Sequence, residues 1–159
     1  RDLRMSRGLG DVYKRQAEYW WVGNGPLEER VKTYIEEKKL TKYIKLLGSR
    51  NDTVELYQGM DAFFLPSFFE GLPVTGVEAQ AMGLSMVVSD TVTREMVYTD
   101  LVDYVSLNDT PEAWASRLEI ALRKNAKREQ YADRLKLSNF SNIGCGNRLE
   151  QVYCWWING

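Results

Sequence analysis

The stretch FFEGLPVTGVEAQAMG, residues 68–83, places one glutamate before a Gly-Leu-Pro turn and a second inside the helix-like run that follows. The apolar run DAFFLP, residues 61–66, comes just before it and is typical of a buried strand. A carboxylate placed where a buried strand runs into a helix costs free energy unless something binds to it. The sequence therefore predicts that Glu70 and Glu78 bind a ligand.

Strand-like and helix-like segments alternate along the chain on both sides of this stretch. The predicted strands are residues 17–23, 43–48, 61–66, 85–90 and 104–108. The predicted helices are residues 24–40, 52–60, 72–82, 109–125, 128–137 and 147–157. Asp52 and Thr110 are expected to cap helices, and Gly83 is expected to end one. Short alternation of this kind predicts an α/β fold, with a Rossmann-like parallel sheet and flanking helices.

The composition narrows the classes of function. The length of 159 residues suits one compact domain, and the net charge of -1 offers no broad positive field for nucleic acid. Histidine is absent, which excludes a Ser-His-Asp triad, a Cys-His dyad and any zinc site containing histidine within this chain. The longest apolar runs are far shorter than a membrane span, so no transmembrane segment is predicted.

The first sixteen residues read differently from the rest. They have no clear apolar period, and DVYKRQ, residues 11–16, resembles the translation of a sequencing-library adapter. We therefore predict that residues 1–16 are a non-native leader, with a natural polar linker as the alternative. The domain itself is expected to cover residues 17–159 and to end in a helical tail.

The turn between the two glutamates has the features of a phosphate site. Ligands of open parallel sheets bind at the carboxyl ends of the strands, and backbone N–H groups at a helix start attract anions. The predicted diphosphate cradle is formed by Gly71, Leu72, Pro73, Val74 and Thr75. Carboxylates beside a diphosphate make sense when they accept hydrogen bonds from neutral hydroxyls. A nucleotide sugar carries diols on both sides of its diphosphate, so one glutamate could hold the sugar and the other the ribose.

The segment PSFFEGLPVTGVEAQAMG resembles the E-x7-E signature of retaining, nucleotide-sugar-dependent glycosyltransferases with the GT-B fold. The segments VGNGPLEERV, IKLLGSRNDTVELYQGMDAFFLPS and GLSMVVSDTVTREM follow the order and spacing of the same family. The resemblance covers about residues 17–122 and is closest to enzymes of capsular and exopolysaccharide assembly. It implies that residues 17–159 are part of the carboxyl-terminal, nucleotide-sugar-binding domain of a GT-B enzyme.

The resemblance also implies roles for single residues. Glu70 matches the catalytic-site glutamate that binds donor-sugar hydroxyls, and Glu78 matches the one that binds the ribose diol. The turn that starts at Gly71 matches the contact with sugar and diphosphate. The nucleotide is expected to meet Gly23, Gly25, Gly48, Ser49, Arg50 and Val54, mostly through backbone atoms.

The implied reaction is front-face sugar transfer with retention, without a metal ion or other cofactor. The donor would be a UDP- or GDP-sugar, and the acceptor a glycan or lipid-linked glycan bound by an amino-terminal domain that this sequence lacks. The isolated chain is therefore expected not to turn over. The resemblance implies a cytoplasmic enzyme, with peripheral association at the inner face of the membrane as an option. Two alternatives remain: a non-catalytic nucleotide-sugar binding or interaction module, and a fragment of a GT-B-fold nucleotide-sugar epimerase.

Overall fold

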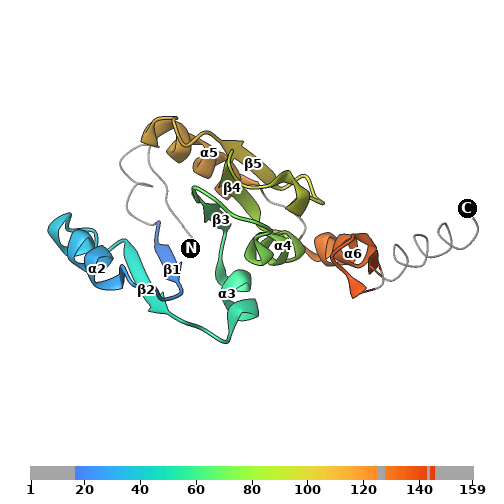
Figure 1. The fold of residues 1–159 in the computed structure, drawn as a ribbon, viewed down its shortest axis with the longest axis horizontal. Helices are drawn as coiled ribbons and strands as arrows, with labels where there is room; N and C mark the ends of the chain where they lie inside the picture. Colours follow the sequence, from blue (N-terminus) through green and yellow to red (C-terminus); the bar gives the residue numbers. More distant parts are fainter. Residues whose placement is uncertain (1–16, 125–127, 143, 146–159) are drawn as a thin grey trace, which may run out of the picture.

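The computed structural model describes residues 17–124, 128–142 and 144–145 (Figure 1). The predicted leader, residues 1–16, and the predicted last helix, residues 147–157, lie outside the described residues. In chain order the elements are β1 (Tyr19–Val22), α2 (Glu28–Glu37), β2 (Ile44–Gly48), α3 (Thr53–Gly59), β3 (Ala62–Leu65), α4 (Val74–Ala81), β4 (Ser85–Ser89), the 3-10 helix η1 (Arg94–Met96), β5 (Val102–Val105), α5 (Pro111–Arg123) and α6 (Glu129–Leu137). The predicted alternation of strands and helices is confirmed.

The strands pair in parallel wherever the structure describes a ladder, as the alternation predicts. They form two sheets instead of one: β1 pairs with β2, and β3, β4 and β5 lie side by side in that order. Side chains join the two sheets. Trp20 of β1 packs against the apolar cluster that includes Phe63 of β3, and a Cβ built on Gly59 would lie 3.4 Å from the Trp20 ring. The expectation of a single sheet is corrected here, because strand pairing depends on contacts between segments far apart in sequence.

The sheet of β3, β4 and β5 is covered on both faces. Successive side chains of a strand point to opposite sides of the sheet. Phe63 and Met86 therefore belong to a cluster with α3, α4 and η1, whereas Phe64 and Val87 belong to a second cluster with α5. Figure 1 shows α4 and α5 on opposite sides of these strands. Burial on both faces explains why β3 and β4 are almost continuously apolar in sequence.

Two predicted boundaries differ from the structure near the central helix and the last strand. The helix expected from Leu72 begins at Val74, because Pro73 is extended (φ −72°, ψ 101°) and a residue before proline disfavours the helical conformation. The strand expected at residues 104–108 is β5, which begins two residues earlier. Gly83 ends α4 as predicted, with a φ of 69°.

One of the two predicted helix caps forms. The hydroxyl of Thr110 accepts a hydrogen bond from the N–H of Ala113 and so caps α5. Asp52 occupies the corresponding position before α3, but its side chain makes no capping bond. The Asp52 carboxylate instead accepts hydrogen bonds from the Arg50 guanidinium, 2.7 Å from Nε to Oδ1. The predicted Asp52 cap is therefore wrong, because a charged partner two residues away competes for the carboxylate.

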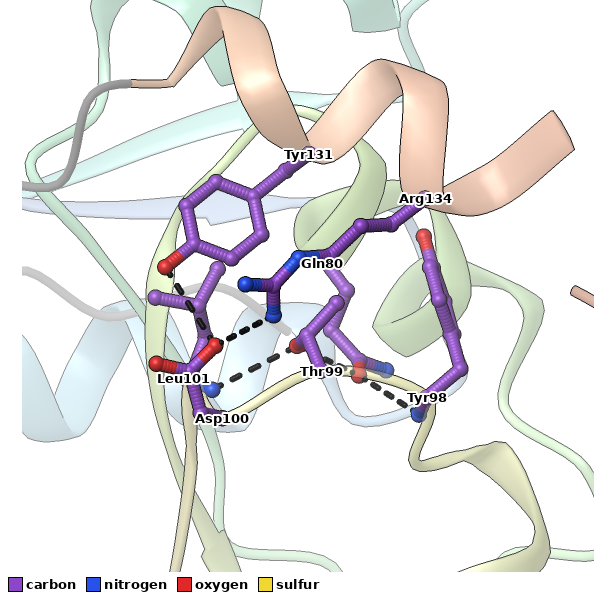
Figure 2. A network of polar contacts seen from close by, with 7 residues as sticks. All are labelled: Gln80, Tyr98, Thr99, Asp100, Leu101, Tyr131 and Arg134. Carbon is purple, nitrogen blue, oxygen red and sulfur yellow. Dashed lines mark hydrogen bonds and ion pairs between the residues drawn. The ribbon is translucent and has the colours of Figure 1, made fainter. Parts of the chain in front are cut away.

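A buried glutamine anchors α4 to the segment that follows η1 (Figure 2). Gln80 is fully buried, and its Nε2 donates to the carbonyls of Gly76 at 3.1 Å and Met96 at 2.9 Å. Its Oε1 accepts from the Tyr98 N–H at 3.2 Å and the Thr99 hydroxyl at 2.9 Å. All four hydrogen-bonding positions of this amide are thus used, which holds the helix that carries Glu78 in one orientation.

The helix α6 and the residue before it contact the segment after η1 and the end of α3. Arg134 donates to the carboxylate of Asp100 at 2.7 Å, and the Tyr131 hydroxyl lies 3.4 Å from the same oxygen (Figure 2). Arg128, just before α6, donates to the carbonyl of Met60 at the end of α3. These contacts tie the last described helix to the segments around the site.

Candidate functional site

The first predicted glutamate lies just beyond the carboxyl end of β3. Ser67 is 5% exposed, and its hydroxyl donates to Oε1 of Glu70 at 2.7 Å. The Ser67 carbonyl accepts hydrogen bonds from the hydroxyls of Ser89, the last residue of β4, and Thr91, two residues further on. One hydroxyl therefore holds the Glu70 carboxylate directly, and two others hold the backbone of the serine that carries it.

The backbone of Glu70 is held as well. Glu70 forms an isolated parallel bridge with Val92, and its side chain is half-buried. The carboxylate thus lies at the carboxyl edge of the β3–β4–β5 sheet, where ligands of parallel sheets bind. A carboxylate that accepts one protein hydroxyl still has lone pairs for others, so Glu70 can accept hydrogen bonds from a polyhydroxylated ligand.

The second predicted glutamate lies on α4. Glu78 is exposed, and its Oε2 accepts a hydrogen bond of 3.0 Å from the hydroxyl of Tyr57. Tyr57 belongs to α3, and its side chain is only 5% exposed. Each of the two predicted glutamates is therefore held by the hydroxyl of a buried residue. Ser67 holds Glu70, and Tyr57 holds Glu78.

The turn between the glutamates is open to solvent except at one residue. Gly71, Leu72, Val74 and Thr75 are exposed, whereas Pro73 is buried and precedes the first residue of α4. No side chain caps this helix, and no acidic residue lies in its first turn. The first N–H groups of a helix have no partner within the helix, so those of Val74 and Thr75 can donate to an anion.

The predicted glycines come together at the carboxyl ends of β1 and β2. The N–H of Gly23 donates to the carbonyl of Gly48 at 2.7 Å. Their φ values of 112° and 63° favour glycine. Gly23, Gly25 and Gly48 line one hollow of about 350 Å³, together with residues at the start of α2. Neither Glu70 nor Glu78 lines this hollow.

The remaining predicted nucleotide residues do not line that hollow. Ser49 and Arg50 are exposed in the loop after β2, and Val54 is 53% exposed in the first turn of α3. The Arg50 side chain is engaged by Asp52, and their hydrogen bond lowers the pKa of Asp52 and raises that of Arg50. Arg50 is therefore one half of a surface ion pair with Asp52.

Four residues of the site were not predicted from the sequence: Ser67, Tyr57, Ser89 and Thr91. Ser67 precedes Glu70 by three residues within the same motif, and a serine at a strand end is the signal that could have identified it. Tyr57, Ser89 and Thr91 gave no such signal, because their contacts join residues 21 to 24 positions apart.

Comparison with known proteins identifies the family. A family model described as Glycosyl transferases group 1 matches residues 7–124, which begins within the predicted leader. The chain belongs to this family. The glycosyl transferase group 1 chain is 41% identical over 70 residues to the UDP-Gal:alpha-D-GlcNAc-diphosphoundecaprenol alpha-1,3-galactosyltransferase of Escherichia coli, which covers 43% of this chain and 18% of that protein.

One further relative and one solved structure are also similar to this chain. The chain is 37% identical over 105 residues to the amylovoran biosynthesis glycosyltransferase AmsK of Erwinia amylovora, covering 55% of this chain and 26% of that protein. The apo structure of the lipopolysaccharide outer core galactosyltransferase WaaB matches with a TM-score of 0.69 at 18% identity, over 86% of this chain and 40% of that one. This likeness confirms the predicted α/β fold of the GT-B type. The chain spans less than a third of the length of these curated relatives.

Proposed function

We propose that this glycosyl transferase group 1 chain binds the nucleoside-diphosphate sugar of a retaining glycosyltransferase that acts in surface polysaccharide synthesis. The observation that carries the proposal is the hydrogen bond from Ser67 to Glu70, which holds a carboxylate at the ligand-binding edge of a parallel sheet. The names of the relatives, a galactosyltransferase with a lipid diphosphate acceptor and an amylovoran enzyme, support the substrate class.

Each part of the site has a role in this proposal. Glu70 binds the hydroxyls of the donor sugar and is the catalytic-site carboxylate, whereas Glu78 binds the ribose diol. The exposed turn of residues 71–75 receives the diphosphate through the free N–H groups at the start of α4. The glycine hollow and the loop of residues 48–54 receive the nucleoside of a UDP- or GDP-sugar.

The chemistry in this proposal is positioning and electrostatic stabilisation. The sugar is transferred with retention from the same face that the diphosphate leaves, and the protein stabilises the departing diphosphate with N–H groups. The proposal includes no metal ion and no other cofactor. Glu70 orients the sugar ring through its hydroxyls so that the anomeric carbon faces the acceptor.

The proposed site binds the donor and not the acceptor. We propose that a glycan or lipid-linked glycan is presented by another domain and that this chain alone does not turn over. None of the helices in the described part of the chain is long and apolar enough to span a bilayer. We further propose that the enzyme works in the cytoplasm, where its acceptor can bring it to the inner face of the membrane.

The test is a binding titration of the 159-residue chain with UDP, GDP and their sugars, followed by calorimetry. Glu78→Gln should weaken binding of the free nucleotide by about tenfold or more, because hydrogen bonds to a charged group contribute about 1.5–3 kcal/mol each. Glu70→Gln should leave nucleotide affinity unchanged and remove the additional affinity that the sugar provides. Glu36→Gln, which changes an exposed glutamate of α2, is the matched control and should bind like the wild type.

The results also separate the alternatives. Equal nucleotide affinity of the wild type and the Glu78→Gln variant would reject the ribose assignment. Sugar transfer by the full-length enzyme that survives Glu70→Gln would reject the catalytic-site role of Glu70, whereas nucleotide-sugar binding without any transfer by the full-length wild type would favour the non-catalytic binding module.

A further inference from the structure

The hydroxyl of Tyr57 has two acceptors on α4. It lies 3.0 Å from Oε2 of Glu78 and 3.4 Å from the carbonyl of Thr75. A phenol has one proton to donate, and the shorter contact to a charged acceptor is the stronger bond. The Tyr57 proton is therefore directed at the Glu78 carboxylate.

Tyr57 is well placed to fix that carboxylate. Its ring is buried in the core cluster and contacts Phe63, with ring centroids 6.2 Å apart. A long, exposed glutamate on a helix otherwise samples several rotamers, which must be restricted when a ligand binds. A fixed donor from the core removes part of that entropy loss in advance.

We propose that Tyr57 is a positioning residue that holds Glu78 in the orientation required by a vicinal diol, and that it sets the preference of the site for ribonucleotides. This inference rests on the proposed function, in which Glu78 binds the ribose. One oxygen of Glu78 accepts from Tyr57, and the remaining lone pairs of the carboxylate accept from the ribose hydroxyls. A ligand that lacks both hydroxyls gains nothing from this arrangement.

A simpler role for Tyr57 would be to anchor α4, and a second tyrosine provides the control for it. The hydroxyl of Tyr98 donates to the carbonyl of Val77 at 2.9 Å, one residue before Glu78. Burial raises the pKa of Tyr98 to about 12, so it remains a donor at neutral pH. Tyr98→Phe therefore removes a hydroxyl that anchors the same helix without touching the Glu78 carboxylate.

The experiment measures one ratio in each protein: the affinity for UDP or GDP divided by the affinity for its 2′,3′-dideoxy analogue. The proteins are the wild-type chain, Tyr57→Phe, Tyr98→Phe, Glu78→Gln and the double variant Tyr57→Phe/Glu78→Gln. Because both affinities are measured on the same variant, a reduced folded fraction cancels from the ratio.

The wild type should prefer the ribonucleotide by about tenfold or more. Tyr57→Phe should reduce this preference by about fivefold, whereas Tyr98→Phe should retain it. In the Glu78→Gln background, Tyr57→Phe should have no further effect, because the residue acts through the carboxylate.

Three outcomes overturn the inference, and they differ in what they say about the proposed function. A wild type with no preference rejects the ribose role of Glu78 and the role of Tyr57 with it. A preference that persists in Tyr57→Phe rejects the positioning role and leaves the ribose role intact. Equal reductions in Tyr57→Phe and Tyr98→Phe show that only the anchoring of α4 matters.

Discussion

Replacement of Gln80 by leucine tests how α4 is held in place. The change keeps a side chain of similar size but removes an amide that makes four hydrogen bonds. Figure 2 shows two of them, with Tyr98 and Thr99. The carbonyl of Gly76 retains its partner in the helix, since Gln80 still donates its backbone N–H to it. The carbonyl of Met96, the N–H of Tyr98 and the hydroxyl of Thr99 lose the partners that Gln80 provides.

The expected loss of stability follows from the burial of these three groups. Met96 is fully buried, so its carbonyl loses a partner that water cannot replace, at about 2 kcal/mol. Tyr98 and Thr99 are half-buried, so water can partly replace the amide at about 0.5 kcal/mol each. We therefore expect Gln80→Leu to reduce the free energy of unfolding by about 3 kcal/mol, or to lower Tm by about 6–12 °C.

Urea unfolding followed by tryptophan fluorescence and circular dichroism measures this loss. The matched control is Gln58→Leu, which replaces an exposed glutamine on α3 and should change stability by less than about 0.5 kcal/mol. A loss below about 1 kcal/mol for Gln80→Leu, at an unchanged m-value, would refute the reasoning that the amide network anchors α4.

Three further predictions concern the site and its surroundings. Ser67→Ala should leave UDP affinity unchanged but reduce the additional affinity for the UDP-sugar by about fivefold in calorimetry, because Glu70 loses its fixed donor; an unchanged gain from the sugar contradicts this. A backbone hydrogen bond at residue 100 and the Arg134 guanidinium lower the pKa of Asp100, so Asp100→Asn should cost about 0.5 kcal/mol of stability at pH 7. A carboxylate with a lowered pKa stabilises the fold above its unfolded pKa of about 4. The stability difference between the wild type and Asp100→Asn should therefore vanish in urea titrations as the pH falls through the folded-state pKa of Asp100. A difference that persists at low pH argues against the ion pair. Excess EDTA should leave UDP affinity unchanged within about twofold in calorimetry, since the proposed site uses no metal ion, and a large loss would show that a cation is required.

The central strands and the helix after them could be predicted from the sequence because local patterns determine them. The apolar runs at residues 61–66 and 85–90 are buried on both faces, so their composition alone identifies them as strands. Gly83 could be predicted because a positive φ strongly favours glycine. The start of α4 lies two residues after the predicted Leu72, because Pro73 disfavours the helical conformation of the residue before it.

The separation of the strands into two sheets could not be predicted. Parallel strands pair with neighbours in space, and no local feature of β1 or β3 specifies which strand lies beside it. Asp52 shows the same limit on a smaller scale. The position of Asp52 before α3 predicts a helix cap, but its carboxylate binds the Arg50 guanidinium instead.

For the site, the sequence indicated the ligand-facing groups but not their supports. Glu70, Glu78 and the glycines were predicted as site residues because their segments resemble those of the glycosyltransferase family. The supports Ser67 and Tyr57 depend on how α3, β3 and β4 come together in space. An aromatic residue such as Tyr57 usually packs in the core, so nothing in the sequence indicated that its hydroxyl contacts a site residue.

The contact between Trp20 and Gly59 affects how the two parts of the site can adjust. The glycine hollow belongs to the pair of β1 and β2, and both glutamates belong to the half built on β3 and α4. In the proposed function, the distance from nucleobase to sugar therefore depends on how Trp20 and Val22 of β1 pack against the cluster around Phe63.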